Sequence, residues 1–137
     1  DAKKNMMFNP DESIDFNGNT GPFIQYTFAR INSILSKRKD FKPCFDSHDS
    51  INELEKDLIK QIIDFPSCIQ QCKEALNPSL LANYIYYLAK TYNKFYQKVP
   101  ILDGSKNEKF RLTISKKVSL IIMNGMGLLG IDVPNRM

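Results

Sequence analysis

The apolar positions of the chain recur at helical spacing in several separate segments. In residues 80–98 they follow one another at steps of four, three, four and three: Leu81, Ile85, Leu88, Tyr92 and Phe95. Residues three and four apart share one side of an α-helix, so this series predicts a helix whose narrow apolar stripe packs in a bundle core. No segment gives a convincing strand, and only LLGIDV near the end is compatible with a short extended piece.

A second helix is predicted directly after the stretch NGNTGP, beginning at Pro22. Thr20 or Asn19 is a suitable N-cap, and Pro22 fits the first turn because its missing N–H would be unpaired there in any case. The run Lys37-Arg38-Lys39 places cations at the C-terminus of this helix, where the helix dipole favours them. NGNTGP is therefore interpreted as the elbow that begins the helix.

Three further helices complete the predicted fold. Ser50 and Glu53 form a capping box that opens the first of them. Pro66 stops that helix and begins a second, short one. The third spans residues 107–124, with Gly125 as its C-cap. About five helices and no clear strand predict an all-α bundle.

The length and composition are those of one globular domain. A chain of 137 residues, 42% apolar and 25% charged, is long enough to bury a core. No apolar run approaches the length of a membrane span, so no membrane contact is expected. Three cysteines are an odd number, which argues against a disulfide framework and for a reducing compartment. The protein is therefore expected in the cytoplasm.

Charge is distributed unevenly along the chain. Residues 46–76 carry seven acids and three bases, a net charge of −4, whereas residues 80–119 carry eight bases and two acids, a net charge of +6. A local basic excess is expected of a surface that meets phosphates. The alternative is that both segments form solvated helices that attract each other.

The sequence offers no recognisable catalytic, cofactor-binding or metal site. His48 is the only histidine, and no serine or cysteine stands in an activating context. Cys68 and Cys72 would share a helix face and could hold zinc with His48, but two cysteines packed in a bundle are the far commoner arrangement. The chain is therefore expected to be non-catalytic.

Several basic and aromatic residues suit a nucleic-acid surface. On the predicted helix over residues 80–98, Lys90, Lys94 and Gln97 lie opposite the apolar stripe, and Tyr86 and Tyr87 flank this polar side. Lysines contact phosphates, and exposed aromatic rings stack on unpaired bases. The simpler alternative is that the lysines keep the helix soluble and the tyrosines bury their rings at the rim of the bundle.

The stretch GNTGPFIQYTFARI resembles the point in arginyl-tRNA synthetases where the catalytic domain meets the helical domain that follows it. The resemblance continues in order through LLANYIYYLAKTYNKFY and FRLT to GMGLLGIDVPNRM, and so covers nearly the whole chain. The Asp-Ala-Leu-Arg signature for which this helical domain is named is kept only loosely, as Phe110-Arg111-Leu112. Cysteinyl-tRNA synthetases carry a related domain, but the GNTGP elbow and the final Arg136-Met137 are similar to the arginyl enzymes.

The resemblance implies two domains with different roles. Residues 1–19 would be the tail of the catalytic domain and residues 20–137 the all-helical anticodon-binding domain. The family enzyme joins arginine to its tRNA using ATP and Mg²⁺, which belong to the catalytic domain, so this chain would itself hold no cofactor. Its partners would be an arginine-accepting tRNA and its own catalytic domain, and a monomer is expected.

The resemblance also implies the residues that contact tRNA. Tyr92, Met137 and either Tyr26 or Phe28 are the predicted stacking contacts for anticodon bases. The predicted contacts to phosphates are Arg30, Arg111, Lys116 and Lys117. The competing hypothesis is a helical protein-interaction module that shares the fold but has no RNA specificity. The two differ in salt dependence, because only phosphate-driven binding weakens steeply as salt rises.

Overall fold

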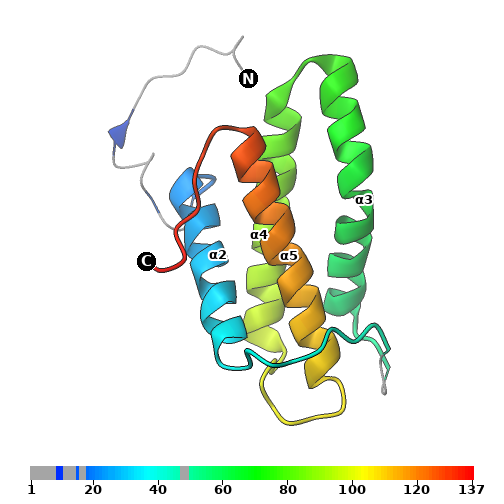
Figure 1. Ribbon diagram of the computed structural model, residues 1–137. Helices are drawn as coiled ribbons and strands as arrows, with labels where there is room; N and C mark the ends of the chain where they lie inside the picture. Colours follow the sequence, from blue (N-terminus) through cyan, green and yellow to red (C-terminus); the bar gives the residue numbers. More distant parts are fainter. Residues whose placement is uncertain (1–8, 11–14, 16–17, 47–49) are drawn as a thin grey trace.

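The computed structural model describes residues 9–10, 15, 18–46 and 50–137 (Figure 1). Four α-helices lie wholly within these residues: α2 (Gly21–Ser36), α3 (Glu53–Ala75), α4 (Pro78–Lys98) and α5 (Glu108–Leu128). No strand occurs in this part of the chain. The all-α fold is confirmed, with four long helices in place of the five expected.

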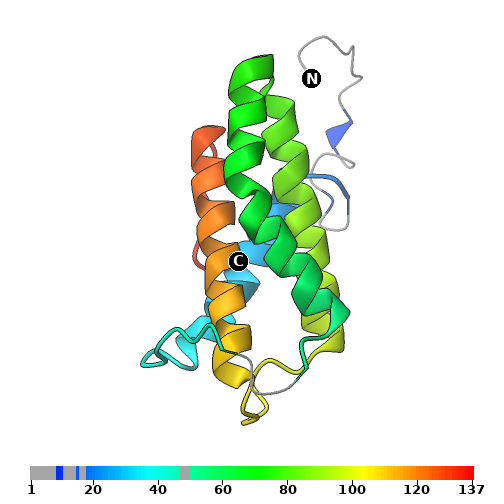
Figure 2. The same ribbon diagram turned by 90° about the vertical axis from the view of Figure 1, so that its right-hand side faces the viewer.

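Successive helices run in opposite directions, and α4 and α5 form the centre of the bundle (Figure 1). Each of these two helices contacts the other and also contacts both α2 and α3. Figure 2 shows α3 on one side of the central pair, and α2 lies on the other. The segment after α5 returns along α2, which brings residues 131–137 beside that helix (Figure 1).

The core follows the apolar stripe predicted for α4. Leu81, Ile85, Leu88, Tyr92 and Phe95 are all buried there. They pack against apolar residues of the other three helices in one continuous cluster. The helix begins as its sequence dictates, because the Asn77 side chain caps it and Pro78 occupies its first turn.

α2 starts where the sequence predicted. The Thr20 side chain accepts a hydrogen bond from the backbone N–H of Phe23, which makes Thr20 the N-cap. The helix ends earlier than expected, with Lys37 as its C-cap, so the cations of residues 37–39 follow the last turn instead of occupying it. The assignment of residues 1–19 to another domain falls mainly on residues outside the described ranges and stays a prediction.

The prediction that Pro66 separates two helices is wrong. α3 continues through Pro66 to Ala75, and its capping box is formed by Asn52 and Glu55 instead of Ser50 and Glu53. Proline has no N–H, so the backbone carbonyl one turn earlier in the helix loses its hydrogen-bond partner. Pro66 is exposed, so its ring stands on the solvent side, and the lost hydrogen bond destabilises the helix less than it would in the core. Leu58 before the proline and Ile69 after it both pack in or against the core, which holds the helix on both sides of Pro66.

The prediction that Gly125 ends the last helix is also wrong. α5 runs on to Leu128, and Gly125 is buried inside it. A Cβ at this position would lie 2.6 Å from Cδ1 of Ile85 in α4, so the glycine permits a close approach of the two helices. The left-handed conformation that follows the helix belongs to Gly130, with a φ of 74°.

Candidate nucleic-acid interface

A guanidinium group lies between two tyrosine rings at the groove between α2 and α4. Cζ of Arg30 is 4.7 Å from the ring centroid of Tyr26 and 4.9 Å from that of Tyr96. Tyr26 stands one helical turn before Arg30 on α2, whereas Tyr96 comes from the last turn of α4. Both distances are within the range of a cation–π interaction. Each ring is 41% exposed, so both present surface to solvent.

Hydrogen bonds from α4 fix the position of this guanidinium. Nη1 of Arg30 donates to Oδ1 of Asn93. Nδ2 of Asn93 in turn donates to Oγ1 of Thr27 (2.8 Å), and that hydroxyl donates to the carbonyl of Phe23 (2.9 Å). Asn93 therefore uses both ends of its amide to tie α4 to α2, and it orients Arg30 toward the two rings.

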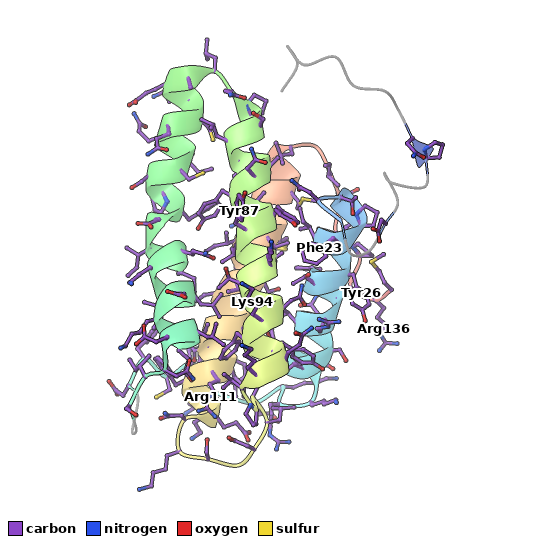
Figure 3. All side chains as sticks on the ribbon, turned by 180° about the vertical axis from the view of Figure 1, so that it is seen from behind. Phe23, Tyr26, Tyr87, Lys94, Arg111 and Arg136 are labelled. Carbon is purple, nitrogen blue, oxygen red and sulfur yellow. The ribbon has the colours of Figure 1, made fainter. Side chains whose placement is uncertain are left out.

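The pocket over this cluster has a volume of about 800 Å³. Its floor is the outer side of α2, one wall is Tyr96, and the other wall is the C-terminal segment. The lining residues are Tyr26, Ala29, Arg30, Asn32, Ser33, Ile34, Ser36, Lys37, Tyr96, Asn135, Arg136 and Met137. Figure 3 shows Tyr26 on α2 and Arg136 of the C-terminal segment, which meet at this pocket.

Two side chains of α2 hold the C-terminal segment in place. Nε2 of Gln25 donates to the carbonyl of Asp132 (2.7 Å), and Nδ2 of Asn32 donates to Oδ1 of Asn135 (3.2 Å). Met137 is 57% exposed and lines the pocket. The site therefore combines flat aromatic surface, a fixed cation, amide groups and a flexible thioether, which together suit a planar ligand that carries negative charge nearby.

The structure brings three of the predicted tRNA contacts together, because Tyr26, Arg30 and Met137 all line the pocket. Tyr96 also lines it and was missed. The sequence signal for Tyr96 was its place four residues after Tyr92, one turn farther along the same helix. The spacing placed Tyr92 on the buried stripe and left Tyr96 off it. Which flank of α4 meets α2 is decided by tertiary packing, so the spacing did not show that Tyr96 would line a pocket beside α2.

Tyr92 and Phe28 occupy the core beneath this surface. Tyr92 is 0% exposed, and its hydroxyl donates a 3.0 Å hydrogen bond to Oγ of Ser115. Burial raises the pKa of Tyr92, so the hydroxyl stays protonated. Phe28 is buried as well. Neither ring has a free face in this structure, and stacking on a base would require it to leave the core.

Arg111 is engaged within the bundle. Its side chain is 15% exposed, and Nε lies 2.8 Å from Oε1 of Glu55, whose side chain is fully buried. Nη1 lies 2.9 Å from Oδ2 of Asp103 and donates to the carbonyl of Pro100. Arg111 therefore joins α5, α3 and the loop between α4 and α5. A phosphate would have to compete with two carboxylates for this guanidinium.

Lys116 and Lys117 are exposed on α5 and do not line the pocket. Their ammonium groups lie 5.8 Å from the ring centroid of Phe41 and 5.9 Å from that of Phe45, both in the segment after α2. That segment is tied to α5 by a 2.8 Å hydrogen bond from the backbone N–H of Cys44 to Oγ1 of Thr113. Lys116 and Lys117 therefore belong to a different surface from Arg30.

Cys68 and Cys72 are placed as packing residues. Cys68 and Cys72 are partly buried against the core, and burial together with the neighbouring Cys72 raises the pKa of Cys68 to about 11. A thiol with this pKa is protonated at neutral pH. Among the described residues, no three histidine, cysteine or carboxylate side chains are grouped to hold a metal ion. His48 lies outside those residues.

Aromatic rings beside a positive charge are the surface features with which many proteins hold unpaired bases. The family model of the DALR anticodon binding domain matches residues 24–137, and the chain belongs to this family. In none of the four helices is there a stretch long and apolar enough to cross a membrane, as far as the described residues go.

The relatives identify the branch of the family. The arginine–tRNA ligase of Flavobacterium psychrophilum is 54% identical over 139 residues, which cover 100% of this chain and 23% of the relative. That of Bacteroides fragilis is 46% identical over 143 residues, covering 100% of this chain and 24% of the relative. The chain thus spans about a quarter of the length of these curated relatives.

The fold is shared with a solved arginyl-tRNA synthetase. The Thermus thermophilus arginyl-tRNA synthetase superimposes with a TM-score of 0.91 at 29% identity, over 98% of this chain and 24% of that one. The resemblance to arginyl-tRNA synthetases predicted from the sequence is confirmed, and so is the helical anticodon-binding fold that it implied.

Proposed function

We propose that the chain binds the anticodon stem-loop of an arginine-accepting tRNA and holds unpaired anticodon bases in the pocket between α2 and the C-terminal segment. The observation that carries this proposal is the fixed guanidinium of Arg30 between the rings of Tyr26 and Tyr96. The membership in the anticodon-binding family supports the same ligand.

Each part of the pocket has a task in this proposal. The half-exposed rings of Tyr26 and Tyr96 offer stacking surfaces, and stacking on an aromatic side chain contributes about 1–3 kcal/mol per base. Arg30 supplies a charge for a phosphate or a base edge. The amides of Asn32 and Asn135 can pair with base edges, which differ in their donors and acceptors.

The role in the longer protein is also a proposal. The relatives are named arginine–tRNA ligases and are about four times longer than this chain. We propose that the chain serves as the RNA-binding domain of such a ligase, monomeric and cytoplasmic, beside a catalytic domain that uses ATP and Mg²⁺ to join arginine to the tRNA. The described residues would then supply recognition and no catalytic group.

The pocket is tested by removing its rings. Tyr26→Ala and Tyr96→Ala should each weaken binding of a labelled arginine anticodon stem-loop by about fivefold to 150-fold, the equivalent of about 1–3 kcal/mol. Both rings are partly exposed, so the fold should be retained, and a thermal melt checks this. Fluorescence anisotropy measures the affinity.

Phe45→Ala is the matched control. This ring is 71% exposed but lies beside Lys117, away from the pocket. Affinity should stay at the wild-type value in this variant. Unchanged affinity in both tyrosine variants, with the fold intact, would show that the bases are held somewhere else.

A further inference from the structure

The two helices that form the pocket carry no acidic residue. Neither α2 nor α4 contains an aspartate or glutamate, although together they hold Arg30, Lys90, Lys94 and Lys98. By contrast, α3 contains five acidic residues: Glu53, Glu55, Asp57, Asp64 and Glu74. These two helices therefore give their side of the bundle four positive charges and no negative one, three of the four on α4, and this balance favours a polyanion.

The outward side of α4 forms a continuous polar strip. Its exposed residues recur at steps of four, three, four and three, the same spacing as the buried stripe of this helix: Asn83, Tyr87, Lys90, Lys94 and Gln97. We call these five residues the α4 strip. Tyr87 is 58% exposed, although it is a large aromatic residue. Figure 3 shows Tyr87 and Lys94 on the side of α4 that is turned to the viewer.

Among the described residues, the lysines of the α4 strip take part in no ion pair. The ion pairs in the described part of the chain involve Arg38, Lys56 and Arg111, and none of them involves Lys90 or Lys94. Nζ of Lys90 lies 5.9 Å from the ring centroid of Tyr86. An aromatic contact of this kind leaves the full positive charge available to an anion.

The α4 strip is next to the pocket. Tyr86, on the flank of α4 beside the strip, packs against Phe23 of α2 with ring centroids 5.4 Å apart. About two turns farther along the same flank Asn93 holds Arg30, and about one turn beyond Asn93 Tyr96 forms the pocket wall. A ligand that leaves the pocket across α4 therefore meets Lys94 first and then Lys90 and Tyr87.

We infer that the α4 strip binds the phosphate backbone of the RNA strand whose bases occupy the pocket. Lys90 and Lys94 contact phosphates, and Tyr87 offers its ring to the strand. This inference rests on the proposed function and adds the path of the RNA strand to it. The strand runs along α4 and not over Lys116 and Lys117 of α5. The latter two lysines lie on a separate surface beside Phe41 and Phe45.

The salt dependence of RNA binding tests this direction. A plot of log affinity against log salt has a negative slope, and each lost phosphate contact reduces the magnitude of this slope by about 0.7–0.9. Lys90→Gln with Lys94→Gln should therefore reduce the magnitude by about 1.4–1.8. The measurement uses this chain and a stem-loop RNA with an arginine anticodon, titrated from about 50 to 200 mM salt. Lys116→Gln with Lys117→Gln is the control pair, and its slope should equal that of the wild type.

The possible outcomes separate this inference from the proposed function. If the wild type shows no salt-dependent binding, the proposed function fails and the inference fails with it. If the wild type binds but the α4 pair keeps its slope, the inference alone is overturned. A slope of smaller magnitude in the α5 pair would place the strand over α5 and overturn it as well. Circular dichroism melts of all variants check that these exposed substitutions leave the fold intact.

Discussion

Arg30 and Arg111 show how surroundings give two arginines different tasks. Arg111 meets the carboxylates of Glu55 and Asp103, so its charge is balanced inside the bundle. Arg30 meets two rings and one amide, and no carboxylate in the described residues lies within ion-pair distance of it. The charge of Arg30 is thus open to an anionic ligand. The sequence presents the two alike, because the difference lies in residues far away along the chain.

A substitution at Tyr92 distinguishes a structural role in the core from a direct contact with RNA. Tyr92→Phe removes the buried hydrogen bond to Ser115 and should lower the free energy of unfolding by about 1 kcal/mol. RNA affinity should not change, because the ring lies beneath the pocket. Urea denaturation and stem-loop binding measure the two effects. A large loss of affinity at unchanged stability would instead make Tyr92 a direct contact.

Part of the site could be predicted from the sequence at this scale. Tyr26, Arg30 and Met137 followed from the resemblance, and they share the pocket. Tyr96 was missed because its exposure depends on how α4 meets α2, and α4 carries five tyrosines. A pattern of spacing shows which residues share a side of one helix. It does not show which neighbouring helix covers that side.

At the scale of the helices, the predictions succeeded where one strong pattern determined the result. The stripe of α4 is unbroken over five positions, and all five are buried. For α3 and α5 the sequence held a helix breaker, Pro66 or Gly125, and the rule that such residues end helices failed. Tertiary packing overrides this local preference, because the proline faces solvent and the glycine meets Ile85.

Two glycines of α5 provide a matched pair for the packing of this helix. In Gly125→Ala the new Cβ would meet the fully buried Ile85, and the crowding should lower the free energy of unfolding by about 1–3 kcal/mol. In Gly127→Ala the Cβ would meet no atom within 4 Å, and the better helix former should raise that free energy by about 0.5 kcal/mol. Thermal and urea unfolding of both variants measure the changes. Equal effects would show that α4 and α5 are not closely apposed at Gly125.

At the scale of the whole molecule, the arrangement of the bundle gathers charge of one sign on one side. The sequence predicted an acidic segment over residues 46–76 and a basic one over residues 80–119. It did not predict that acid-free α2 would lie beside acid-free α4, since that depends on the crossing of four helices. α3, with its five acidic residues, lies on the other side of the central pair (Figure 2).

The pocket joins parts of the chain that are far apart in the sequence. Its floor, its two walls and the hydrogen bonds that hold the C-terminal segment come from α2, α4 and residues 132–137.

The central claim is that this pocket reads anticodon bases, and one binding measurement tests it most directly. The chain is titrated with an arginine anticodon stem-loop and with the same stem-loop carrying a changed anticodon, at about 50 and 200 mM salt. The account predicts tighter binding of the arginine anticodon at both salts and weaker binding of each loop at the higher salt. Equal affinity for the two loops would contradict the claim. Binding that does not respond to salt would contradict it too, and would favour a protein-interaction module.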